Sequence, residues 1–116
     1  MSLDKMDDIS VESTATPVLK AHITVIGQHD YILQNVENIL SRAGYSTRGF
    51  LNTEEAAEYI KMNPVDLVFI GGGINPNDRI ALRKMIESDF AIIKVVEHFG
   101  GPATILTEIE EALKKV

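Results

Sequence analysis

A set of polar or very small residues directly follows predicted strands, where parallel sheets usually carry their chemistry. Successive glycines can turn backbone N–H groups toward a phosphate, above all where a helix begins close by. Histidines next to carboxylates can hold a metal ion or move a proton. The candidate binding residues are Gln28, His29, Asp30, Gly71, Gly72, Gly73, Asn75, Asp78, Glu97 and His98.

The glycine run "GGGINPND", residues 71–78, matches neither of the common phosphate-binding motifs. No Gly-Lys-Ser or Gly-Lys-Thr follows it, and the GxGxxG spacing is not met. Glycine also lets a chain leave a strand with positive φ, so a structural turn is the simpler interpretation. Asp78 is likewise predicted to cap the next helix rather than to bind a ligand.

Two histidines could meet at the carboxyl edge of the predicted sheet. There His29 and His98, assisted by Asp30 or Glu97, could hold a metal or transfer a proton. Their spacing matches no metal-ligand signature, however. We therefore predict loop histidines that face solvent or form hydrogen bonds, with no metal and no cofactor.

Several function classes are disfavoured by the residue types. The sequence has no cysteine, no nucleophile elbow with a Ser/His/Asp order, and no prominent pair of carboxylates at strand ends. The net charge of −6 disfavours nucleic acids and anionic membrane surfaces as partners. We predict a cytoplasmic protein that is not an enzyme.

Length and composition indicate one globular domain. The chain has 116 residues, of which 45% are hydrophobic and 24% charged. Residues 1–20 are acidic, rich in Ser and Thr, and show little periodicity, which predicts a flexible N-terminal arm before a domain at residues 21–116. No apolar run is long enough to cross a bilayer, and the first residues lack the order of a signal peptide.

Within the domain, continuous apolar runs typical of buried parallel strands alternate with apolar residues at helical spacing. Glycine, proline and capping residues mark the helix ends; Asn52 with Glu55, for example, resembles a capping box. The predicted elements are, in order, a strand at residues 21–27, a helix capped by Asp30 and ended by Gly44, a strand at 45–50, a helix opened by Asn52, a strand at 65–71, a helix capped by Asp78, a strand at 90–99 and a helix begun by Pro102.

This strand and helix order predicts an α/β fold, a parallel sheet of about four strands with helices on both faces. The carboxyl edge of that sheet collects the candidate binding residues. The strand at 90–99 would leave an unpaired hydrophobic edge, which predicts a homodimer through residues 91–99 or the adjoining helices. Alternatively, the arm at residues 1–20 would cover this strand edge.

Three segments resemble the receiver domain of bacterial two-component response regulators: "ITVIGQHD", "AGYSTRGFLNTEEAAEYIKMNPVDLVFIGGG" and "FGGPATILTEIEEALKK". The resemblance covers residues 21–116 and implies a three-layer, flavodoxin-like sandwich with strand order 2-1-3-4. The chain is shorter than a receiver by about one strand and one helix. The resemblance also implies a signalling role.

Receivers carry an acidic pair that binds magnesium, an aspartate that accepts a phosphoryl group, a hydroxyl residue and a lysine. The matching positions here are Gln28 and His29 for the acidic pair, with Asp30 one residue late, Gly71 for the phosphoacceptor, Val96 or Glu97 for the hydroxyl, and residues 98–102 for the lysine. Without these carboxylates neither the oxygen cage for magnesium nor the nucleophile is present. The resemblance therefore implies a non-catalytic signalling or protein-interaction module that is not phosphorylated on aspartate.

An alternative hypothesis is a small-molecule or nucleotide-binding protein that uses the turn at residues 71–73 and His29. "GGGINPND" is similar to a phrase in cobalamin-binding domains, where a histidine after the first strand ligates cobalt. His29 would be the matching histidine, but Gly27 and Ile32 replace the Asp and Gly that flank it in that motif.

Overall fold

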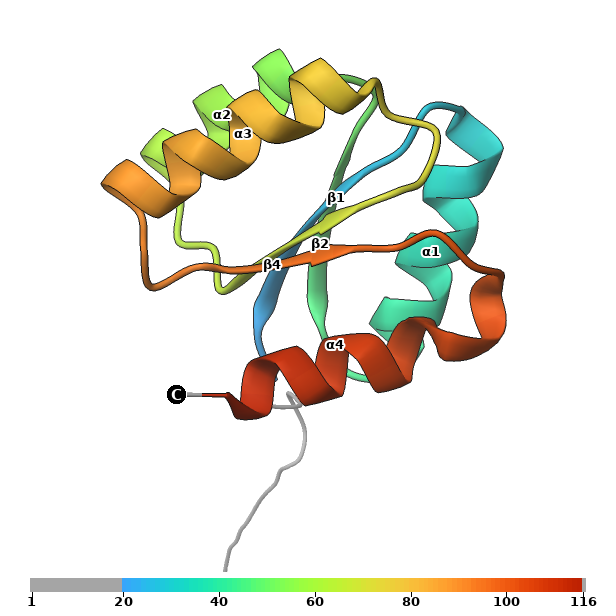
Figure 1. Ribbon diagram of the computed structural model, residues 1–116. Helices are drawn as coiled ribbons and strands as arrows, with labels where there is room; N and C mark the ends of the chain where they lie inside the picture. Colours follow the sequence, from blue (N-terminus) through green and yellow to red (C-terminus); the bar gives the residue numbers. More distant parts are fainter. Residues whose placement is uncertain (1–19, 116) are drawn as a thin grey trace, which may run out of the picture.

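Residues 20–115 fold into four strands that alternate with four α-helices (Figure 1). This computed structural model describes residues 20–115, so the predicted arm lies outside the described residues, except for Lys20. The elements are β1 (His22–Ile26), α1 (Asp30–Arg42), β2 (Ser46–Phe50), α2 (Thr53–Met62), β3 (Leu67–Ile70), α3 (Pro76–Asp89), β4 (Lys94–Glu97), a 3-10 turn (Pro102–Thr104) and α4 (Ile105–Lys114). Within that range, no helix is both long and apolar enough to span a membrane.

All four strands run parallel in the order β2-β1-β3-β4, which confirms the predicted topology. β1 lies between β2 and β3, with Ile23 opposite Thr47 on one side and Leu67 on the other. The continuous apolar runs of β1 and β3 follow from this position, because the inner strands of a parallel sheet are covered on both faces.

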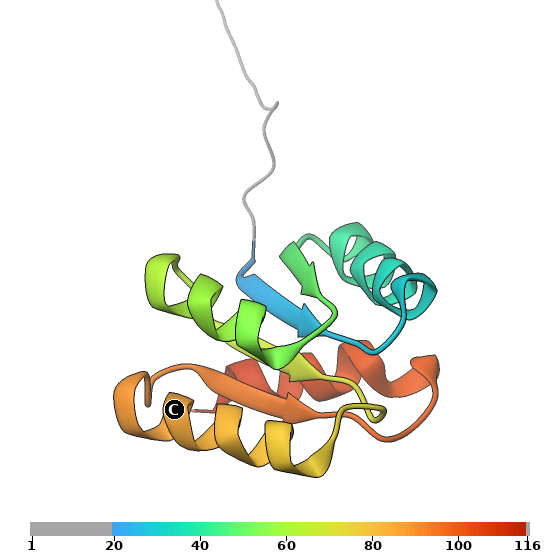
Figure 2. The ribbon, with the colours of Figure 1, turned by 90° about the horizontal axis from the view of Figure 1, so that it is seen from above.

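Helices cover both faces of the sheet, α1 and α4 on one and α2 and α3 on the other (Figure 2). Side chains alternate along β3 and so contribute to two separate cores. Leu67 and Phe69 pack with α1 and α4, whereas Val68 and Ile70 pack with α2 and α3. The three layers form the predicted flavodoxin-like sandwich.

Two helices do not begin at the predicted caps. His29 is the N-cap of α1, and Asp30 is its first helical residue. A carboxylate at that position stabilises the helix because it lies near the positive end of the helix dipole. Asn75 caps α3, and Asp78 lies inside its first turn. The prediction of Asp78 as a cap is wrong because Pro76, with its fixed φ and missing N–H, takes the first helical position.

Other local signals are confirmed. The side chain of Asn52 accepts a hydrogen bond from the N–H of Glu55 at 2.9 Å and caps α2. Gly44, with φ of +98°, follows the end of α1, as expected for a helix terminated by a left-handed residue. Pro102 begins the 3-10 turn that continues directly into α4.

The fourth strand is much shorter than the predicted span of residues 90–99. β4 comprises only Lys94–Glu97, because β3 offers only Leu67–Ile70 for pairing. The preceding residues end α3 and form a turn, in which the N–H of Ile93 donates to the carbonyl of Phe90 at 2.9 Å. The apolar stretch before β4 therefore does not extend the sheet edge.

Candidate functional site

Loops that follow β1, β3 and β4 meet at the carboxyl edge of the sheet. The N–H of Gly71 donates to the carbonyl of Ile26 at 2.9 Å, which places the start of the loop after β3 beside the end of β1. The N–H of His98 donates to the carbonyl of Ile70 at 2.9 Å, which places the chain after β4 beside β3. The predicted residues that follow these strands therefore lie in neighbouring loops.

Gly71 lies directly after β3 at a point of close backbone approach. A Cβ atom added there would be 3.2 Å from the carbonyl oxygen of Ile26, tighter than an ordinary contact. Close packing therefore explains the glycine. The expectation of positive φ in the run 71–73 is wrong, because among the described glycines only Gly44 has it.

The glycine turn and the start of α3 present few groups to an anion. The side chain of Gln28 covers Gly73, and Pro76 has no N–H to offer. The N–H of Asn77 is already bound by the Asn75 side chain at 2.8 Å. The carboxylate of Asp78 adds negative charge to the first turn. These features do not favour a phosphate or nucleotide at this turn.

The two histidines at this edge have different surroundings. His29 is exposed and stacks on Tyr31, with ring centroids 5.6 Å apart. His98 is buried and stacks on Phe69 at 5.3 Å. Across residues 20–115, no group of three or more His, Asp or Glu side chains is placed to hold a metal ion.

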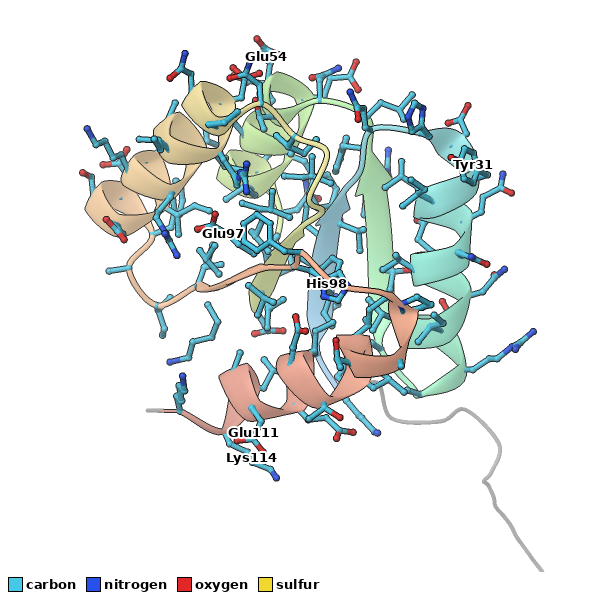
Figure 3. All side chains as sticks on the ribbon, turned by 45° about the vertical axis from the view of Figure 1, so that its right-hand side comes forward. Tyr31, Glu54, Glu97, His98, Glu111 and Lys114 are labelled. Carbon is cyan, nitrogen blue, oxygen red and sulfur yellow. The ribbon has the colours of Figure 1, made fainter. Side chains whose placement is uncertain are left out.

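Glu97 is the last residue of β4 and is labelled in Figure 3. Two arginines of α3 form ion pairs with it. Its carboxylate lies 2.5 Å from Arg83 and 3.7 Å from Arg79, and only 18% of its side chain is exposed. Arg79 also donates to the carbonyl of Ile74 at 3.0 Å and lies 4.9 Å from the centre of the Phe99 ring. Glu97 therefore fastens α3 to the sheet and is not a free base.

His98, the next residue, engages α4 on the opposite face. Its Nδ1 atom lies 2.9 Å from Oε1 of Glu108, and the hydroxyl of Thr104 donates to Oε2 of Glu108 at 2.7 Å. Partial burial raises the pKa of Glu108, but the hydrogen bonds from His98 and Thr104 and the charge interaction with His98 outweigh burial and hold it below its ordinary value. The ionised carboxylate therefore favours a proton on Nδ1 of His98.

Sequence reasoning identified His98 but missed its two partners. Thr104 and Glu108 are separated by four residues at the start of α4, a spacing that places them on one helix face. That spacing was visible in the sequence. What was not visible is that α4 packs back onto the face where His98 emerges.

An apolar cavity of about 310 Å³ opens between α1, α4 and the carboxyl ends of the strands. His98 and Phe69 line it, and Tyr31 of α1 belongs to its exposed rim. No residue at its wall carries a formal charge if the histidine is neutral. The lining residues are Val25, Ile26, Gly27, Tyr31, Ile32, Leu33, Asn35, Val36, Ile39, Phe69, Gly71, Gly72, His98, Gly100, Pro102 and Ile105.

Comparison with known proteins identifies the fold. No protein-family model matches the sequence, and no curated protein matches it either. Solved structures do match. The N-terminal domain of a response regulator receiver protein from Methanoculleus marisnigri JR1 has 26% sequence identity and a TM-score of 0.62, covering 79% of this chain and 76% of that chain.

Two further structures are similar at lower identity. A response regulator from Thermotoga maritima has 20% identity and a TM-score of 0.61, covering 81% of this chain and 80% of that chain. The beryllofluoride-activated NtrC4 receiver domain dimer has 17% identity and a TM-score of 0.61, covering 78% and 77%. The chain therefore has a receiver-like fold, and part of each similar structure has no counterpart in it.

Proposed function

We propose that this protein is a receiver-like signalling module that is not phosphorylated on aspartate and acts by contacting other protein surfaces. The observation that carries this proposal is the identity and environment of Gly71. It follows β3, where receivers carry the phosphoacceptor, and it has no side chain to accept a phosphoryl group.

The neighbouring residues support the same proposal. Gln28 and His29 stand where receivers carry the acidic pair, and neither supplies a carboxylate. Asp30 is exposed and belongs to α1. Glu97 is neutralised by two arginines of α3. Magnesium would therefore lack its usual set of carboxylate ligands at this edge.

Incubation with acetyl phosphate and magnesium, followed by intact-mass measurement, tests the proposal. The mass should stay unchanged, while a receiver domain that retains its aspartate is modified in parallel. A stoichiometric phosphoryl adduct would refute the proposal. The variant Asp30→Asn would then show whether that carboxylate is the acceptor.

The contact surface that we propose is the free edge of β4, in the first place toward a second copy of this chain. Among the residues that the structure describes, β2 and β4 are the two edge strands of the sheet. The N–H groups of Lys94 and His98 donate toward β3, so strand alternation turns those of Val95 and Glu97 outward. Exposed apolar side chains flank the edge, with Ile92 87% and Phe99 70% exposed. One similar structure, the NtrC4 receiver domain, is described as a dimer.

Sedimentation velocity with a matched pair of variants tests the homodimer. Val95→Pro removes an outward N–H and keeps an apolar side chain, whereas Val95→Ala keeps the N–H. The wild type and Val95→Ala should associate as concentration rises through the micromolar range, and Val95→Pro should remain monomeric. A wild-type monomer throughout that range would exclude the homodimer.

The same proposal includes two further predictions, that the protein is not an enzyme and that it is located in the cytoplasm. The absence of cysteine and of any recognisable catalytic arrangement in the sequence supports a protein that is not an enzyme. The same lack of cysteine is compatible with the cytoplasm, where disulfides are rare.

A further inference from the structure

The cavity beside His98 has the size and composition of a ligand site, and the proposed signalling role does not use it. Its volume of about 310 Å³ reaches the range of roughly 300–1,000 Å³ that is usual for small-molecule pockets. Its floor is formed by β1 and β3, and α1 and α4 form its sides. A pocket between rigid elements of this kind is largely formed before a ligand arrives.

The chemistry of the wall selects an uncharged, mostly apolar ligand. Aliphatic and aromatic side chains dominate it, among them Val36, Ile39, Phe69 and Ile105. Neither lysine nor arginine is among its residues, so a phosphate or carboxylate would find no cation there. The aromatic ring of Tyr31, at the rim and 69% exposed, offers a flat surface for stacking.

One polar atom in this wall is unsatisfied. Among the side chains that the structure describes, Nε2 of His98 is the buried nitrogen or oxygen without a hydrogen-bond partner. The side chain of His98 is only 8% exposed. Buried polar atoms are nearly always paired, and His98 is a wall residue of the cavity, so this unpaired atom indicates a partner that reaches it from there. Because Nε2 is now covered, the wall must shift slightly to admit that partner.

The network behind His98 determines what Nε2 can do. Glu108 accepts a hydrogen bond from Nδ1–H of His98 at 2.9 Å and a second one from the hydroxyl of Thr104 at 2.7 Å. In the neutral ring, a protonated Nδ1 leaves Nε2 as a hydrogen-bond acceptor. A ligand that pairs with this form of the ring therefore brings a donor, a hydroxyl or an N–H group.

We propose that the cavity binds a small, uncharged aromatic molecule and that His98 Nε2 accepts a hydrogen bond from its hydroxyl or N–H group. The apolar wall supplies shape and hydrophobic contact, and His98 supplies orientation. Thr104 and Glu108 act as positioning residues for that histidine.

Two closely matched probes test the proposal, 2-naphthol and 2-methoxynaphthalene. They share the same two rings, but only the first has a hydroxyl to donate. In a titration followed by ¹⁵N–¹H NMR, 2-naphthol should shift the amide signals of Gly71, Gly100 and Ile105 saturably. The methoxy compound should bind about two- to tenfold more weakly, the factor expected for one hydrogen bond.

Variants separate the hydrogen bond from the shape of the cavity. His98→Asn retains an N–H donor near Glu108 but has no atom at the position of Nε2, so it should bind both probes with the same, weaker affinity. Ile39→Phe reduces the cavity volume and should weaken both probes. Met62→Ala, outside the cavity and away from the edge of β4, should change neither. Circular dichroism checks that each variant is folded.

The proposal fails if 2-naphthol causes no saturable shift at the cavity, or if the two probes bind the wild type equally. It also fails if folded His98→Asn still distinguishes them. Should His98→Asn not fold, the comparison of the two probes on the wild type and on Ile39→Phe still decides the question.

Discussion

At the scale of single residues, two features characterise the carboxyl edge of the sheet. They are the close backbone contacts at its glycines and the partners of its charged and polar side chains. Gly71 meets the carbonyl of Ile26, and Gly72 lies close to the carbonyl of His98. His98 and Glu97 are adjacent, yet alternation along β4 directs them to opposite faces of the sheet. The apolar cavity therefore lies on the His98 side of the edge, and the ion pairs of Glu97 lie on the other side.

The close approach at Gly71 predicts a cost for the smallest side chain. Gly71→Ala should reduce the free energy of unfolding by about 1–2 kcal/mol, because its Cβ would press on a backbone carbonyl. Gly101→Ala is the control, since a Cβ at that position meets nothing within 4 Å. It should be neutral or slightly stabilising, by up to about 1 kcal/mol. Urea denaturation measures both, and equal losses would contradict the packing argument.

The pKa of Glu108 predicts a dependence of stability on pH. Its folded pKa lies below the ordinary value of 4.5, so ionised Glu108 stabilises the fold above the unfolded pKa. That contribution is lost as pH falls through the lowered folded pKa. The difference in unfolding free energy between the wild type and Glu108→Gln should therefore shrink as pH falls from 7 toward 3. Urea denaturation at several pH values measures this difference. A difference that stays constant with pH would contradict the lowered pKa of Glu108.

At the scale of elements, the sequence predicts the first residue of a helix correctly where it offers one capping residue. The prediction fails where two capping residues lie close together. Asn52 caps α2 as expected, because its side chain needs only the N–H of Glu55, three residues away. Asn75 and Asp78 both qualify as caps of α3, and Pro76 decides in favour of Asn75. The length of β4 was overestimated since its apolar residues gave no sign that β3 is short.

The cap of α2 can be tested with a matched pair of asparagines. Asn52→Ala should lower the free energy of unfolding by about 1 kcal/mol, because an N–H at the helix start loses its partner. Asn38→Ala, at an exposed position inside α1, should be neutral or slightly stabilising because alanine favours helices. Thermal unfolding by circular dichroism compares them. A larger loss of stability for Asn38→Ala than for Asn52→Ala would contradict the role of Asn52 as the cap of α2.

At the scale of the whole molecule, two helices cover each face of the sheet within the residues that the structure describes. α4 follows β4 and crosses back beside α1, which it contacts together with β3 and β4. On the other face, the arginines of α3 hold Glu97 at the end of β4. Both contacts fasten the edge strand to the helical layers.

The ion pair between α3 and β4 predicts unequal effects of two carboxylates that share Arg83. Glu97→Gln should reduce the free energy of unfolding by about 1–2 kcal/mol, because Glu97 is 18% exposed and its loss leaves arginines with fewer partners. Glu87→Gln should stay within about 0.5 kcal/mol, because that carboxylate is 68% exposed. Urea denaturation at moderate salt compares them, and equal effects would show that α3 is held mainly by its apolar face.

The sequence by itself determined the order of elements, the parallel sheet and the glycine after β3, because apolar periodicity and turn residues act over short stretches of chain. Only the tertiary structure decided that β4 is short, that the glycine turn is covered by Gln28, and that His98 has Glu108 as its partner. The cavity also belongs to this second group, since it exists only where α1 and α4 meet the ends of the strands. Such features depend on distances between distant segments, and these distances are set only when the layers pack.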